Sequence, residues 1–206
     1  MNEKRIGLFS AEYETRELDG MGIVEGYAVV FNNETDLGLF REVIAPEALV
    51  NTDLRDVRLC KNHDTDFVYA RSRNNNENST MQLFVDNKGL RFLAKLAINE
   101  SPAAQDYFTA AKRKDMTGMS FMFVVRGEEW EGLETESPLR RITDISKIIE
   151  LSMVTFPAYE STDIQARSKE ALDSARQALE SAREQRAKPL DSELDLMKLK
   201  IKILGG

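Results

Sequence analysis

Three residues in this chain have side chains that together could perform covalent catalysis: a serine, a histidine and a glutamate. Ser120 begins the run 120–125, which is almost wholly hydrophobic. A short run of branched and aromatic residues favours a buried strand, and alternation of its faces would place Ser120 with Met122 and Val124. Most buried serines only hydrogen-bond to backbone, so Ser120 by itself indicates no activity.

His63 is the single histidine of the chain, so any mechanism that needs a histidine base must use it. It follows residues 57–61, an apolar segment expected to be a strand, and such strand ends often carry functional side chains. Glu150 lies in a hydrophobic run, where an unpaired ionised carboxylate would be expensive to bury. The His63 imidazole, Arg140 or Arg141 could satisfy it, or Glu150 could lie exposed at a strand edge.

A hydroxyl nucleophile, a histidine base and a carboxylate that orients the histidine form the serine-hydrolase constellation, which is recognised by geometry rather than chain order. Spacing alone supports it weakly, because nearly every protein contains these residue types. A cysteine nucleophile would be Cys60, but it lies three residues from His63 along an extended segment, roughly 10 Å away. A buried structural thiol is the interpretation we favour. A metal site built from His63, Asp64 and Asp66 lacks zinc-ligand spacing.

Length and composition indicate one sizeable domain, or one domain with an appendage. The 206 residues can bury a substantial core. The formal net charge of −7 argues against a general nucleic-acid binder. The single cysteine suits a reducing compartment, and neither a signal peptide nor a membrane-spanning run is evident. We therefore expect a soluble protein made inside a cell.

Alternating hydrophobic runs and turn residues predict a chain built mainly of short strands. The expected elements are strands at residues 22–31, 40–44, 57–61, 81–85, 90–98, 120–125, 141–145 and 148–156, and helices at 46–51 and 103–114. Ser101 and Pro102 suit the N-cap and first position of the second helix. Gly89 is expected at a positive φ in a hairpin turn, and residues 128–138 as an acidic loop.

The composition shifts beyond residue 167. Residues 168–188 are rich in Ala, Glu, Arg and Gln, and a narrow seam at heptad-like spacing consists of Leu172, Ala175, Leu179 and Ala182. This predicts a helix that ends at Pro189, followed by a strand-like alternation over residues 197–204. The segment could be a solvated appendage or a detachable or docking tail.

Several blocks of residues resemble the tailed-phage prohead (capsid maturation) serine proteases. The resemblance covers roughly residues 20–167 in the family's order. Its motifs are Gly26-Tyr27-Ala28, Glu42-Val43-Ile44-Ala45-Pro46-Glu47-Ala48-Leu49, Leu59-Cys60-Lys61-Asn62-His63-Asp64, Gly118-Met119-Ser120-Phe121 and Glu150-Leu151-Ser152-Met153-Val154-Thr155-Phe156-Pro157-Ala158-Tyr159. Modest departures include Met122, where a glycine often follows Ser-Phe, and Ala70-Arg71 in place of Gly-Arg.

The resemblance implies a mixed, mainly β fold: an antiparallel β-barrel flanked by helices, like the herpesvirus maturation proteases, with a C-terminal helical tail. It divides the chain into a protease domain, residues 1–167, and a tail, residues 168–206. The matching positions make Ser120 the nucleophile, His63 the general base and Glu150 the third member. No cofactor or metal is implied. By analogy with the viral fold, oxyanion-hole donors are expected near Ala158.

The resemblance also implies partners and a place of action. The expected substrates are the scaffolding segment of the major capsid protein and the chain itself, inside the immature phage capsid in the host cytoplasm. Neither nucleic acid nor membrane is expected as a partner. Analogy with the related viral proteases also suggests that the chain forms a homodimer. Exposed segments are easily cleaved, so self-cleavage is expected within residues 168–188, detaching residues 197–204. The alternative is a non-catalytic capsid-assembly scaffold or chaperone that docks through its C-terminal helix.

Overall fold

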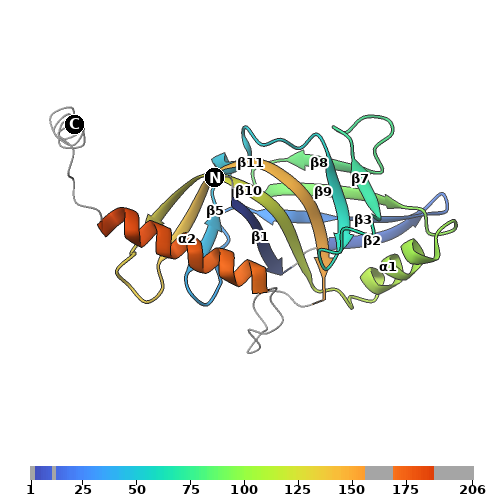
Figure 1. Cartoon of the computed structure of the whole chain (residues 1–206). Coiled ribbons are helices and arrows are strands. Elements are labelled where there is room, and N and C mark those ends of the chain that lie inside the picture. The colour runs from blue at the N-terminus through green and yellow to red at the C-terminus, as the bar shows by residue number, and fades with distance from the viewer. Residues whose placement is uncertain (1–2, 11–12, 156–168, 188–206) are drawn as a thin grey trace.

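The computed structural model describes residues 3–10, 13–155 and 169–187 of the chain, which form two β-sheets and flanking helices (Figure 1). The seven-stranded sheet contains β1 (Glu3–Ser10), β4 (Thr35–Asp36), β5 (Arg41–Ile44), β6 (Val57–Lys61), β7 (Ala70–Ser72), β10 (Gly118–Glu131) and β11 (Leu139–Val154). The four-stranded sheet contains β2 (Tyr13–Leu18), β3 (Met21–Val30), β8 (Met81–Val85) and β9 (Gly89–Leu96). The helices are η1 (Pro46–Leu49), a 3₁₀-helix, α1 (Pro102–Lys112) and α2 (Lys169–Ala187).

The long strand β11 organises the larger sheet. Along one edge it pairs antiparallel with β10, which in turn pairs with β1. Along the other edge it pairs in parallel with two strands in succession, β5 near its start and β6 near its end. β6 therefore runs beside the last part of β11, and the residues that follow β6 emerge at the end of this strand pair.

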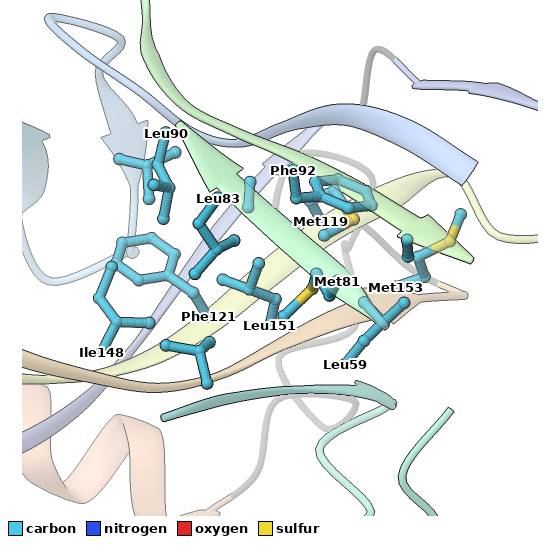
Figure 2. Packing of buried hydrophobic residues seen from close by; sticks show 14 of the residues in the cluster. Leu59, Met81, Leu83, Leu90, Phe92, Met119, Phe121, Ile148, Leu151 and Met153 are labelled. Atoms are coloured by element: carbon cyan, nitrogen blue, oxygen red, sulfur yellow. The ribbon is translucent and has the colours of Figure 1, made fainter. Parts of the chain in front are cut away.

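The hydrophobic core lies between the two sheets. Figure 2 shows Phe121 of β10 and Leu151 of β11 packed with Leu83 and Phe92 of the smaller sheet. All four are buried, with at most 5% of their surface exposed. Because side chains alternate along a strand, the residues before and after these core positions point to the opposite face of the larger sheet.

Helix α1 contacts the end of β6 through Tyr107. It begins as its sequence predicts, with the Ser101 hydroxyl accepting a hydrogen bond from the Ala104 backbone N–H at 3.2 Å. Its Tyr107 is 1% exposed, stacks on Tyr69 with ring centroids 4.2 Å apart, and donates its hydroxyl to the Cys60 carbonyl at 3.3 Å. No helix among the described residues is long and apolar enough to cross a bilayer.

The expected mainly β architecture is confirmed, but the expected closed barrel is wrong for the described residues. Their strands pair within two separate open sheets, and no ladder joins the two. The larger sheet is mixed, because β5 and β6 both run parallel to β11. Parallel pairs need long crossover connections, which a short-range pattern of alternating residues does not reveal.

The β10–β11 hairpin is longer than expected. Residues 128–131, predicted to begin an acidic loop, continue the ladder with β11, and the two strands predicted after the loop are one strand. Register shifts between Met122 and Glu128 bend the pair, and polar residues are acceptable in a strand that extends beyond the core. Gly89 has no positive φ: it lies in β9, where a Cβ atom would stand 1.9 Å from the Val29 carbonyl oxygen.

The predicted C-terminal helix is present as α2, and the described part of it packs on the sheet domain. Ala178 and Leu179 are 8% and 6% exposed, and Leu179 clusters with Leu37 and Phe40. The Arg183 guanidinium donates to the Leu133 carbonyl at 3.2 Å. Of the two alternatives for this segment, a solvated appendage does not fit these two buried positions. The predicted stop at Pro189 and the pattern at residues 197–204 lie outside the described residues.

Candidate active site

The structure brings Ser120, His63 and Glu150 into one continuous chain of hydrogen bonds. The Ser120 Oγ lies 2.6 Å from His63 Nε2, and His63 Nδ1 lies 2.6 Å from Glu150 Oε1. Three different segments supply them: β10, the turn after β6, and β11. Ser120 and Glu150 have no exposed surface, whereas 20% of the His63 side chain is exposed. Solvent therefore reaches the group from the histidine side.

The sheet explains why serine and glutamate share a face. Ser120 is the register partner of Ser152, and Met122 is that of Glu150, so these four alternate with core residues and lie on the face opposite the core. The buried Glu150 carboxylate is accepted there because the Ser152 hydroxyl and the His63 imidazole hydrogen-bond to it. In both strands, therefore, residues that point into the core alternate with residues that point to the face carrying the site.

The hydrogen bonds define the tautomer that the imidazole needs. An ionised carboxylate only accepts hydrogen bonds, so Nδ1 of His63 must carry the proton that Glu150 Oε1 accepts. In a neutral imidazole the other nitrogen, Nε2, is then an acceptor, and the Ser120 hydroxyl donates to it. This is the tautomer in which histidine can remove a proton from a serine hydroxyl.

His63 occupies a tight turn with an uncommon backbone. Lys61 and Asp64 form an antiparallel bridge, and the two residues between them, Asn62 and His63, have φ of 50° and 62°. Positive φ at both central positions is typical of a type I′ turn, which asparagine accepts readily and histidine less so. The turn is fixed to β11, because the Asn62 backbone N–H donates to the Met153 carbonyl at 3.1 Å. Such left-handed residues persist where surrounding contacts hold them.

Glu150 has hydrogen-bond partners on both carboxylate oxygens. Oε1 accepts from His63, and Oε2 accepts from the Ser152 hydroxyl at 2.6 Å. The Ser152 Oγ also accepts the His63 backbone N–H at 3.0 Å. Sequence reasoning missed Ser152 as a site residue, although a second small hydroxyl two positions after a buried glutamate was a signal for it.

The arginines considered as partners for Glu150 are engaged elsewhere in the described structure. Arg140 is fully buried near the start of β11, where its guanidinium pairs with Glu42 at 3.2 Å and also with Glu128. Arg141 lies 3.8 Å from Glu131. Of the partners proposed from the sequence, the imidazole is therefore the one in contact with Glu150.

Cys60 is a buried thiol in β6. It has no exposed surface, and burial together with the nearby Glu150 charge raises the pKa of the Cys60 thiol to about 12. At neutral pH the thiol stays protonated, and a protonated thiol is a poor nucleophile. This agrees with its interpretation as a structural residue.

The segment expected to supply an oxyanion hole, around Ala158, lies outside the described residues. Thr155, the last described residue before it, is held beside the site, because the Asn62 side-chain oxygen accepts the Thr155 backbone N–H at 3.1 Å. The same turn that carries His63 therefore also holds the chain as it leaves β11.

Comparison with known proteins gives the same family as the motifs. The model of the caudovirus prohead serine protease family matches residues 10–177. The prohead protease of Enterobacteria phage HK97 is 32% identical over 148 residues, which are 70% of this chain and 60% of that protein. The chain therefore spans less than two thirds of that relative's length. The solved structure of the bacteriophage T4 capsid assembly protease, gp21, has a TM-score of 0.40 and 7% identity, and the match covers 74% of this chain and 99% of that one. This chain belongs to the caudovirus prohead serine protease family.

Proposed function

We propose that this chain is a serine endopeptidase that cleaves the scaffolding segment of a major capsid protein, and its own chain, inside the immature phage capsid in the host cytoplasm. The observation that carries the proposal is the unbroken hydrogen-bond chain from Ser120 through His63 to Glu150, with both links at 2.6 Å. Membership of the prohead serine protease family supports the choice of substrate.

In the proposed reaction the Ser120 oxygen attacks the carbonyl carbon of the scissile peptide bond. As the new C–O bond forms, the Oγ proton passes to Nε2 of His63, which a 2.6 Å contact already aligns. The imidazolium then gives this proton to the leaving amine. In the second half of the reaction water attacks the acyl carbon while His63 takes a proton from it. The bond to Ser120 Oγ then breaks, His63 returns the proton to Oγ, and the acid product leaves.

Glu150 would contribute by orientation and by charge. Its Oε1 fixes the Nδ1-protonated tautomer, and its negative charge stabilises the imidazolium that forms in both steps. Complete burial of the carboxylate keeps water from competing for the same nitrogen. No metal or cofactor takes part in this scheme.

Co-expression with the candidate capsid protein tests the proposal. Wild type should give truncated capsid protein and a shortened protease by intact mass, whereas Ser120→Ala should give neither. The matched control is Ser72→Ala, because Ser72 is an equally buried serine in β7 that bonds to Asn75. It should cleave like wild type. If wild type and Ser120→Ala both give full-length chains and the same shells, the catalytic proposal fails and the scaffold function takes its place.

We also propose the boundary between protease domain and tail at residues 167 and 168, with self-cleavage within residues 168–188 that releases residues 197–204. A protease substrate must lie extended across the catalytic serine, so α2 would have to unwind around a peptide bond before that bond could be cleaved. Burial of Leu179 opposes that unwinding. The mass of the shortened chain gives the position of the cut. A wild-type chain that stays intact while it cleaves capsid protein would contradict self-cleavage.

A further inference from the structure

We propose that Ser152 is a positioning residue of this site, which holds the Glu150 carboxylate and the His63 backbone in fixed positions relative to each other. The inference rests on the proposed function. Ser152 has no exposed surface and lies in β11, directly opposite Ser120 of β10 and Cys60 of β6. Its hydroxyl is thus at the centre of the three strands that carry the site.

The Ser152 hydroxyl uses both its donor and its acceptor capacity on the site. It donates to Glu150 Oε2 at 2.6 Å and accepts the His63 backbone N–H at 3.0 Å. The first is a short hydrogen bond to a charged group, a class about twice as strong as neutral pairs. One hydroxyl therefore links the carboxylate to the main chain of the residue that this carboxylate must orient.

Loss of this hydroxyl would release two parts of the site at once. Glu150 Oε2 would lose its described donor in a buried place, so the carboxylate could rotate away from the plane of the imidazole. The His63 N–H would lose its acceptor in a turn whose positive φ depends on surrounding contacts. Both changes act on Glu150 and His63, so they would affect Ser120 through the imidazole.

Ser72 provides a closely matched control. It is equally buried, donates its hydroxyl to the Asn75 side-chain oxygen at 3.1 Å and accepts the Asn75 backbone N–H at 3.4 Å. It pairs with Val57, at the opposite end of β6 from His63. Ser72→Ala therefore removes the same atoms and the same kinds of hydrogen bond, at a distance from the site.

The first measurement is labelling by a fluorophosphonate, followed by intact mass. In this reaction a bond forms between Ser120 Oγ and phosphorus, fluoride leaves, and His63 takes the Oγ proton. We expect Ser152→Ala to lower the maximal labelling rate about tenfold to hundredfold, the effect of one hydrogen bond to a charged group. The probe concentration at half-maximal rate should stay unchanged, and Ser72→Ala should label like wild type.

The second measurement reads the imidazole directly. Because the chain has one histidine, ¹⁵N-histidine labelling gives one pair of ring nitrogen resonances. In Ser120→Ala we expect the Nδ1-protonated tautomer with a downfield Nδ1–H proton. Adding Ser152→Ala should weaken that proton signal and mix the tautomers, whereas adding Ser72→Ala should not. If Ser152→Ala does not fold, Ser152→Cys keeps the shape with a weaker donor and should shift both readouts in the same direction.

The outcomes separate the two proposals. If Ser152→Ala folds and both the labelling rate and the imidazole spectrum match wild type, Ser152 is not a positioning residue. A slower rate with an unchanged imidazole spectrum also overturns the inference, because the effect would not pass through His63. If wild type is never labelled while the spectrum changes as expected, the hydrolase proposal fails and the positioning of His63 by Ser152 stands.

Discussion

Glu150→Gln tests the role of the buried carboxylate with almost no change in shape. The substitution replaces one carboxylate oxygen by an amide NH₂, which only donates hydrogen bonds. If the NH₂ faces His63, Nδ1 must accept, the proton moves to Nε2, and the imidazole can no longer take the proton of Ser120. If the NH₂ faces Ser152, the serine hydroxyl loses its described acceptor. Both orientations disturb a network in which every contact is 2.6 to 3.0 Å long.

The expected magnitude follows from the geometry. With His63 Nδ1 and Glu150 Oε1 2.6 Å apart, the centres of the two charged groups lie about 4 Å apart. At an effective dielectric constant of about 20, loss of that attraction costs the imidazolium about 4 kcal/mol. Because each 1.36 kcal/mol is about tenfold in rate, kcat should fall by about 10³-fold. Amide replacement of the carboxylate in another serine protease lowers kcat by about 10⁴-fold, which includes the wrong tautomer.

The assay is the maximal rate of fluorophosphonate labelling, with capsid-protein cleavage as a second readout. Glu42→Gln is the control, because Glu42 is a buried carboxylate of the same sheet whose described partner is Arg140. It should lower the unfolding temperature and leave the labelling rate of the folded protein near that of wild type. A folded Glu150→Gln protein that labels within about tenfold of wild type would refute the proposed role of the charge.

Two further predictions concern residues outside the catalytic chain. Cys60 should resist iodoacetamide at pH 8 in the native protein and react once guanidinium unfolds it. In the folded protein its thiol is buried and, with a pKa raised to about 12, stays protonated. Rapid alkylation of the folded protein, seen by mass, would contradict this. Leu179→Ala should weaken the free energy of docking of α2 by about 2–3 kcal/mol and speed amide exchange in the helix, whereas Gln177→Ala, at an exposed position, should do neither. Equal exchange in both variants would show that the helix does not depend on this contact.

Local patterns in the sequence predicted the elements that carry their own signals. The strands β6 and β8 fall where alternation and turn residues placed them, and α1 begins at its predicted cap, Ser101. The candidate site residues were also identified from the sequence, by their types and by the family motifs. Their contact distances were not, because His63 and Ser120 are 57 positions apart and spacing along the chain says nothing about such a contact.

Elements whose formation depends on distant partners were missed. β1 is an edge strand defined by its ladder with β10, more than a hundred residues away, and β7 is a short strand defined by β6. The contact of Ser152 with His63 was missed for the same reason, although its spacing from Glu150 was a local signal. Its contact with the His63 backbone exists only because β6 lies parallel to the end of β11, and nothing in a hydrophobic run reveals which strand will pair beside it.

The geometry of the site depends on that parallel register. Four pairs, from Glu150 with Arg58 to Met153 with Lys61, set how far β6 extends before the His63 turn begins. A slip of one residue would reverse the faces of β6, exposing Leu59 and moving the turn by about 3.3 Å, beyond the reach of the 2.6 Å contacts. Contacts at the end of β6 oppose such a slip: Tyr107 bonds to the Cys60 carbonyl, and the turn itself bonds to β11. The core thus fixes the register, and the register fixes the distance between the histidine and both of its partners.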